Sequence, residues 1–495
     1  MKSAWLAWIV LAGQIAAPGS AAIEATPENA ALKVLLDGVQ AVLDGVDDSA
    51  APAQPEAPPA VVFLDVEQCV AIALEQNAQA LAADEAVKAA EARTGQAASR
   101  RLPQLKTQAA YNYISGLDRE VKIKGPLSWL IDANDIGPNP HSITAEIRAE
   151  QVLYAGGRIQ AAVRASRHLA QSEAWKREAR LDQIEFEAKQ AFYDALLAKA
   201  LVEVARDSVA TFEQHKADVA QMLEVGLVSR FELLRAETEL GARQTELVSA
   251  QSAAQIAHLN LLRILAMPQN TPVELGGALE WTPPTDTLEA LIDEALARRA
   301  ELHALDMGIA AARNHLEASK GGYKPSAAAT AGYKYIEGGG AIAADGFIVG
   351  VGLEWDIYAG GRRRHERLEA RAQLKQLERE REDVARLVEM DVRQAYLRVQ
   401  EAIAKIRREK GTVALAQEGL RLAQLRFQEG VGTQTETLDA DLALRVARTT
   451  LAQALRDYAV AVAALDKAAG RRWTPRETPD NERRNCPSCK IWSRP

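Results

Sequence analysis

The sequence predicts an α+β membrane protein made of a duplicated unit of helix, strand, strand, long helix and helix. Three observations indicate this fold class: segments of the first half recur in the second, alternating strands flank one loop in each copy, and two long helical runs follow them. The chain has 495 residues, too many for one ordinary core. Only 5% of its residues are aromatic, while Ala, Glu, Arg and Leu are abundant, which favours long helices.

The first 22 residues are predicted to be an export signal. Lys2 precedes an apolar run from Ala4 to Ala17, and small residues up to Ala22 follow it. This run and every later apolar stretch are shorter than the roughly 20 residues of a membrane-spanning helix, so a membrane location would require strands. Residues 23–62 are then an N-terminal extension that ends in an Ala/Pro-rich linker.

An internal repeat divides the rest of the chain into two units, 63–270 and 271–470. The segment Tyr-Ala-Gly-Gly-Arg at 154–158 recurs at 358–362, an offset of 204. The same offset relates further pairs: Gly226 to Gly430, Ser229 to Thr433, and Glu232 to Glu436. Upstream the offset is 222, so the first copy holds 18 extra residues. We expect them in the loop 116–140, outside the cell, because outer loops tolerate insertion.

Each copy contains two candidate strands in which apolar and polar side chains alternate. They cover about 104–115 and 142–154 in the first copy, and about 326–337 and 346–357 in the second. A half-buried soluble sheet and a set of membrane strands both fit this alternation. Four strands cannot close a barrel, and an open edge cannot lie in hydrocarbon. A membrane location therefore requires several chains, and three would supply twelve strands.

The remainder of both copies is predicted to be helical. The runs 158–225 and 362–429 hold 68 residues each and, at about 1.5 Å per residue, would extend for roughly 100 Å. Shorter helices are expected at about 230–265 and 288–320. Stacked end to end, these two would pair antiparallel with one long helix along its full height.

Composition and motifs argue against several other functions. A net charge of −8 with interspersed cations and anions argues against a nucleic-acid partner. The seven histidines lack metal-binding or protease spacing, so no catalytic, cofactor or metal site is predicted. In the tail, 471–495, Cys486 and Cys489 form a single CxxC, for which a disulfide or spare thiols are a better interpretation than a zinc site.

The duplicated order of elements, with its two Tyr-Ala-Gly-Gly-Arg and two Gly-x-x-Ser/Thr-x-x-Glu segments, resembles the TolC family of outer-membrane efflux proteins from about Phe63 to Gly470. The resemblance implies a homotrimer with a twelve-stranded β-barrel among outer-membrane lipids, on a long α-helical barrel in the periplasm. It implies a passive channel of a tripartite efflux or type I secretion system rather than an enzyme. Its partners would be a periplasmic adaptor and an inner-membrane transporter.

Two other classes of protein share some of these features. A periplasmic coiled-coil adaptor also has a helical hairpin, but it has one hairpin between small β-domains. A soluble helical scaffold would leave the four alternating strands unexplained. Only the channel should require detergent and fractionate with the outer membrane as a trimer.

The resemblance also assigns roles to the turns 226–232 and 430–436, which match the periplasmic tips. The adaptor-docking residues that it implies are Gly226, Ser229, Glu232, Gly430 and Thr433. Glu436 and Asp439 match acidic residues that line the family's aperture; the alternative is that both are ordinary acids stabilised by the helix dipole. Some relatives close the tip with Tyr and Arg side chains, and Phe427 and Gly432 occupy those positions here.

Overall fold

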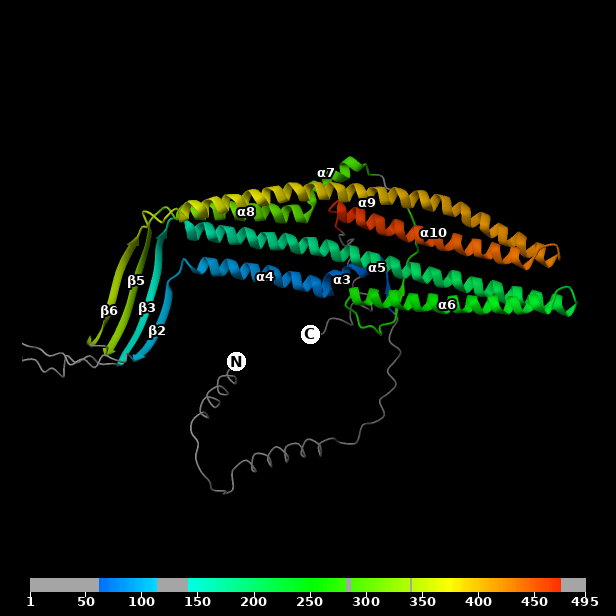
Figure 1. Cartoon of the computed structure of the whole chain (residues 1–495), viewed down its shortest axis with the longest axis horizontal. Helices are drawn as coiled ribbons and strands as arrows, with labels where there is room; N and C mark the ends of the chain where they lie inside the picture. The colour runs from blue at the N-terminus through cyan, green and yellow to red at the C-terminus, as the bar shows by residue number, and fades with distance from the viewer. Residues whose placement is uncertain (1–61, 114–140, 282–285, 339–340, 473–495) are drawn as a thin grey trace, which may run out of the picture. The chain divides into compact units, whose positions relative to one another are not determined.

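The computed structural model describes residues 62–113, 141–281, 286–338 and 341–472. The predicted export signal, nearly all of the extension and linker, the expected outer loop at 116–140 and the CxxC of the tail lie outside the described residues. Within the described part, the secondary structure follows the predicted duplication (Figure 1).

Two helices of 67 residues, α5 (Arg158–Glu224) and α9 (Arg362–Gln428), are the longest elements of the two copies. Each begins after the Gly-Gly of the repeated segment, where Gly157 and Gly361 have φ angles of 86° and 82°. These left-handed angles favour glycine. The repeated segment is thus the corner at which a strand turns into a long helix.

Six shorter helices pack against the long ones. They are α3 (Val66–Gln76), α4 (Ala78–Ser99), α6 (Arg230–Ile264), α7 (Leu288–Arg298), α8 (Ala300–Gly321) and α10 (Gln434–Ala468). Helices α4 and α6 lie along α5, whereas α8 and α10 lie between α5 and α9 and contact both (Figure 1). Each copy therefore ends in a helical hairpin: α5–α6 is called hairpin 1 and α9–α10 hairpin 2.

The predicted continuous helix over 288–320 is wrong, because the chain breaks at Arg299. The residue has an extended ψ of 122°, and its guanidinium donates to the carbonyl oxygens of Lys467 and Ala468 at 3.4 Å, where α10 ends. Asn77, which precedes Arg299 by the repeat offset of 222, breaks the first copy in the same way and donates to the Ile264 carbonyl at 2.9 Å. These side chains satisfy carbonyls that a helix end leaves free.

The predicted end-to-end stacking of the helices at 230–265 and 288–320 is also wrong, although α6 and α8 both pack along α5 as expected. The segment that meets the end of α6 is α4, through Asn77, and the segment that meets the end of α10 is α8, through Arg299. Each copy thus stacks its own helices, since the capping side chain comes from the start of the same copy (Figure 1).

The four long strands form one antiparallel sheet in the order β2-β3-β5-β6, which leaves β2 and β6 at its edges. Their bounds are β2 Gln104–Tyr113, β3 His141–Ala155, β5 Ser326–Gly338 and β6 Ala341–Glu354. The predicted last strand is displaced, since β6 begins five residues before 346 and ends before Trp355. Apolar side chains along β6, such as Phe347 and Val351, stay exposed. A second sheet pairs β1 (Val62–Leu64) with β4 (Val273–Leu275) in parallel.

Each copy of the repeat has its own apolar core, and the two cores are equivalent. In the first, Ile184 of α5 packs with Leu261 and Leu265 at the end of α6, and Val70 and Ala73 of α3 complete the cluster. The second core contains the matching elements α7, α9 and α10. Apolar burial therefore stabilises each copy separately.

Candidate functional site

The two tips are turns of the same design. Gly226 and Gly430 have φ angles of 77° and 73°, and the next amides, of Leu227 and Val431, donate back to Met222 and Arg426 at 2.8 and 3.0 Å. This six-residue closure with a left-handed glycine is a Schellman motif. Both glycines are therefore required by the backbone, whatever else the tips contact.

The residues that follow the glycines start the returning helices. The Thr433 hydroxyl accepts a hydrogen bond from the Glu436 amide at 3.2 Å, while Ser229 caps α6 without such a bond. Glu232 and Glu436 lie in the first turns, where the helix dipole favours acids. The structure thus supports a capping role for Thr433 and is compatible with the dipole alternative for Glu436.

Glu436 and Asp439 are both exposed and lie three residues apart on α10. The packed face of this helix carries other residues: Gln434, Thr437, Asp441, Leu444 and Ala447. Arg426 of α9 is the nearest cation to Glu436, with 3.8 Å between Nε and Oε2. The two carboxylates therefore share an unpacked face next to the tip of hairpin 2.

Exposed apolar side chains at the tip of hairpin 1 were missed in the sequence. Leu227 and Phe231 are 74% and 68% exposed, and Val225 is exposed beside them. Their repeat partners are Val431, Thr435 and Glu429, so hairpin 2 has a more polar tip. Comparing the copies position by position would have revealed this asymmetry.

Where α5 meets α9 near the tips, His215 and Phe427 are in contact, with ring centroids 5.0 Å apart. His215 is 6% exposed, and its Nε2 has no hydrogen-bond partner. On the same faces, Gln428 donates to Asp218 at 3.1 Å. At Gly432 an added Cβ would lie 3.0 Å from the backbone of Arg426 and Phe427, so a larger residue would crowd the turn there. An aromatic contact thus joins the hairpins at Phe427, where some members of the family have a polar side chain that closes the tip.

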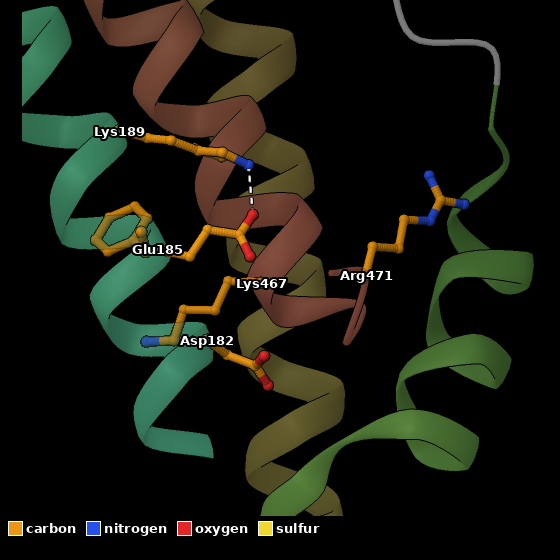
Figure 2. A pocket seen from close by; sticks show the side chains of 7 residues that line it. Asp182, Glu185, Lys189, Lys467 and Arg471 are labelled. Carbon is orange, nitrogen blue, oxygen red and sulfur yellow. Dashed lines mark hydrogen bonds and ion pairs between the residues drawn. The ribbon is translucent and has the colours of Figure 1, made fainter. Parts of the chain in front are cut away.

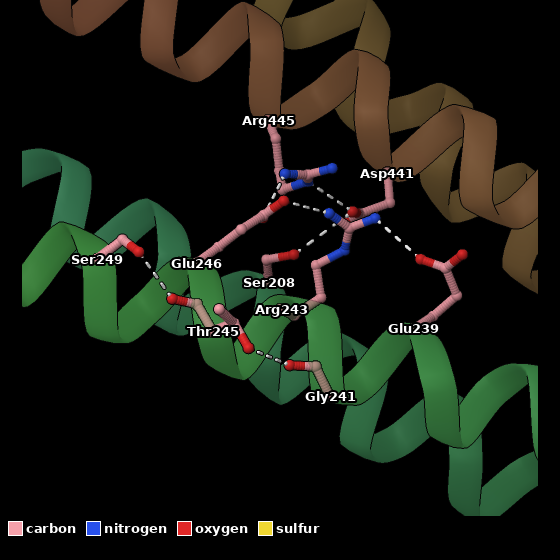
Figure 3. A network of polar contacts seen from close by, with 9 residues as sticks. All are labelled: Ser208, Glu239, Gly241, Arg243, Thr245, Glu246, Ser249, Asp441 and Arg445. Atoms are coloured by element: carbon pink, nitrogen blue, oxygen red, sulfur yellow. Dashed lines mark hydrogen bonds and ion pairs between the residues drawn. The ribbon is translucent and has the colours of Figure 1, made fainter.

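A polar network joins α10 to hairpin 1 above the tips (Figure 3). Asp441 is 3% exposed, accepts from Arg445 at 2.9 Å and from Ser208 at 3.4 Å, and burial raises its pKa. Arg445 also donates to Glu246 at 2.8 Å, as does Arg243. A single carboxylate therefore connects α5 and α10, and its arginine partner reaches α6.

The network continues away from the tips as a row of polar pairs between α5 and α10, which we call the seam. It comprises Arg448 with Asp207 at 2.9 Å, Arg456 with Asp194 at 2.6 Å, and Lys467 with Gln183. At its upper end Asp182, Glu185 and Lys189 of α5 line a pocket with Lys467 and Arg471 (Figure 2). Burial raises the pKa of Asp182 and lowers that of Lys467. Between α5 and α10 the copies thus meet through polar side chains, whereas near the tips Val219 of α5 and Phe427 of α9 share a small apolar cluster.

Nothing in the described part of the chain forms a cluster of three or more His, Cys, Asp or Glu side chains suited to a metal ion. Among the same residues, no helix is both long and apolar enough to cross a membrane.

A duplicated chain with a four-stranded sheet on two long helical hairpins defines the protomer of a channel protein. The chain belongs to the outer membrane efflux protein family, whose model matches residues 70–267 and 291–471. Outer membrane protein TolC of Vibrio cholerae is 24% identical over 346 residues, which cover 65% of this chain and 79% of the relative.

Solved channels share the fold. The structure of CusC superposes with a TM-score of 0.67 at 20% identity, covering 86% of this chain and 99% of that one. The outer-membrane channel OprN gives a TM-score of 0.67 at 18% identity over 83% and 91% of the two chains. The predicted family and fold class are confirmed.

The function implied by the resemblance is confirmed at the level of the family. The protein is an outer-membrane channel of the efflux and type I secretion type, with its helical part in the periplasm. Such channels are homotrimers that work with a periplasmic adaptor and an inner-membrane pump.

The contact of His215 with Phe427 should weaken in acid. Burial lowers the pKa of His215 from its ordinary value of 6.5. The imidazole therefore takes up a proton more readily when α5 and α9 separate near the tips, and the contact loses stability as the pH falls below about 6.5. We expect hydrogen exchange in peptides 213–219 and 424–430, corrected for intrinsic rates, to be up to about tenfold faster at pH 5.5 than at pH 7.5. His215→Gln should remove this difference. An equal pH response in the variant would show that other groups cause it.

Proposed function

We propose that three copies of this chain close edge to edge into a passive conduit that performs no catalytic step of its own. The order of neighbours supports this arrangement at every level. It is β2-β3-β5-β6 in the sheet, α4-α5-α8-α9 in the helices next to the sheet, and α6-α5-α10-α9 in the hairpins. One edge of the chain is therefore always β2, α4 or α6, and the other is always β6 or α9.

The free edges of the hairpins carry apolar stripes. On α6 the stripe consists of Leu234, Val248, Ile256 and Leu259; on α9 it consists of Leu415, Leu422 and Leu425. These side chains are exposed in the single chain and recur at the spacing of one helix face. We infer that α6 of one copy packs on α9 of the next, which closes the helical barrel. This pair of complementary edges is the observation that carries the proposal.

The tips are the proposed docking surface for the adaptor. Gly226, Ser229 and Glu232 of hairpin 1, with Gly430 and Thr433 of hairpin 2, shape the two turns. The exposed Leu227 and Phe231 supply apolar area that a partner can bury. The contrast between the two tips favours tighter binding at hairpin 1.

The proposed aperture is lined by Glu436 and Asp439. Their exposed face of α10 gives six carboxylates in a trimer, and a narrow passage with low-dielectric walls strengthens their attraction for cations. Arg426 offsets part of this charge, although Glu436 remains 46% exposed. The constriction should therefore favour cations.

Replacing Leu227 with Asn tests docking without disturbing the turn, because only the exposed side chain changes. Loss of a buried leucine contact should weaken adaptor binding by roughly tenfold or more and reduce pump-dependent export accordingly. The matched control is Val431→Asn in hairpin 2, which should have the smaller effect. Trimer abundance in the outer membrane should be normal in both variants. Equal export by wild type and Leu227→Asn would exclude this side chain from the docking surface.

Replacing Glu436 with Gln and Asp439 with Asn tests the aperture, since both changes keep the size and remove the charge. Reversal potentials of reconstituted trimers in a salt gradient should lose cation selectivity. The helix-dipole alternative predicts only a loss of stability, within about 1 kcal/mol per site. Intact trimers with unchanged selectivity would remove both residues from the aperture.

A further inference from the structure

Basic side chains gather where the sheet joins the helices. In this region α4 and α8 end, and α5 and α9 begin (Figure 1). The four junction segments, 100–103, 158–167, 318–325 and 362–368, contain eleven Lys and Arg and one Glu. The whole chain has a net charge of −8, so this concentration of positive charge is local.

Most of these cations have no acidic partner within the described part of the chain. Asp356 pairs with Arg362 and Arg363, Glu366 pairs with Arg362, and Glu317 pairs with Lys320. The other eight are exposed and form no ion pair with any described residue; we call them the basic collar: Arg100, Arg101, Arg158, Arg164, Arg167, Lys324, Arg364 and Arg367. A trimer therefore carries 24 such cations around the junction of the sheet and the helices.

Helix stability does not account for the collar. Neither α5 nor α9 has an acid in its first turn, although the dipole favours acids there. Instead Arg158 and Arg364 place positive charge at the positive ends of the two longest helices. The seam shows the opposite arrangement, since there each arginine has an acidic partner.

The aromatic side chains next to the collar mark its level relative to the membrane. Tyr154 lies near the end of β3, Trp355 directly follows β6, and Tyr358 is 87% exposed four residues before α9. Tyr and Trp concentrate at the level of lipid headgroups in membrane barrels. The helices lie in the periplasm, so the collar lies at the periplasmic surface of the outer membrane. Arg367 is five residues into α9, which is about 8 Å of helix and within a Debye length of that surface.

We propose that the basic collar binds anionic phospholipid headgroups of the periplasmic leaflet. The guanidinium groups donate paired hydrogen bonds to phosphate oxygens, and the neighbouring aromatic rings lie at the same headgroup level. Binding at this level holds the trimer at a fixed height, with the sheet in hydrocarbon and the long helices in the periplasm.

The test compares purified trimers in detergent with phosphatidylglycerol and phosphatidylcholine of the same acyl chains. Native mass spectrometry measures the lipid retained by each trimer. Wild type should retain more phosphatidylglycerol than phosphatidylcholine. The triple variant Lys324→Gln, Arg364→Gln, Arg367→Gln should lower the ratio by at least about fivefold, the factor that a single cation contributes at an anionic surface.

Two further variants separate charge from folding. Lys324→Arg with Arg364→Lys and Arg367→Lys keeps the charge and should keep the lipid ratio of wild type. The control Arg386→Gln, Arg398→Gln, Arg408→Gln removes three exposed arginines from α9, the helix of Arg364 and Arg367, but farther from the sheet, and should leave the ratio unchanged. Equal retention of both lipids by wild type would overturn the proposal. So would a triple variant that keeps the lipid preference and loses instead binding to peptidoglycan sacculi or the selectivity of the pore.

Discussion

The architecture depends on one constraint: a single chain contributes only part of a closed surface. Its sheet ends at β2 and β6, and its helices end at α4 or α6 on one side and α9 on the other. Unpaired strand edges are not stable in hydrocarbon. The exposed apolar stripes on α6 and α9 are equally unfavourable in water. Assembly of identical chains around one axis pairs the strand edges and covers the apolar stripes at the same time.

Within this constraint, the two large apolar cores lie inside the copies, whereas polar side chains join α5 to α10. Apolar side chains fill each copy of the repeat around Ile184 or Val392, and capping by Asn77 or Arg299 stacks the helices of that copy. Between α5 and α10 the two copies meet through the seam and the buried Asp441, and near the tips they meet through the contact of His215 with Phe427. Polar groups that separate form hydrogen bonds with water instead, whereas apolar side chains exposed to water gain no replacement for the contacts that they lose. The hairpins are therefore better suited to move relative to each other than to come apart internally.

The sequence was sufficient for the repeat, the four strands and the two long helices, because period-two alternation and uninterrupted helical runs are local signals. The break at Arg299 was missed, since its cause is a bond to α10 about 170 residues away. The positive φ angles of Gly226 and Gly430 are sufficient to explain why glycine occupies both positions, without a role in docking. The contacts of His215 and Asp441 and the grouping of the basic collar arise between different helices, and periodicity along the sequence does not identify which helices are neighbours.

The most direct test of edge-to-edge closure is an intermolecular disulfide between α6 and α9. Val248 belongs to the α6 stripe, and Gly411 lies one helical turn before Leu415 of the α9 stripe, at about the same distance from its tip. An added Cβ at Gly411 meets no atom within 4 Å. With Cys486 and Cys489 replaced by serine, oxidation of the variant Val248→Cys, Gly411→Cys should yield covalent trimers on a denaturing gel. The control pair Val248→Cys, Glu409→Cys, which lies off the stripe, should stay monomeric. Monomers from both pairs, in trimers that are intact before denaturation, would contradict the arrangement.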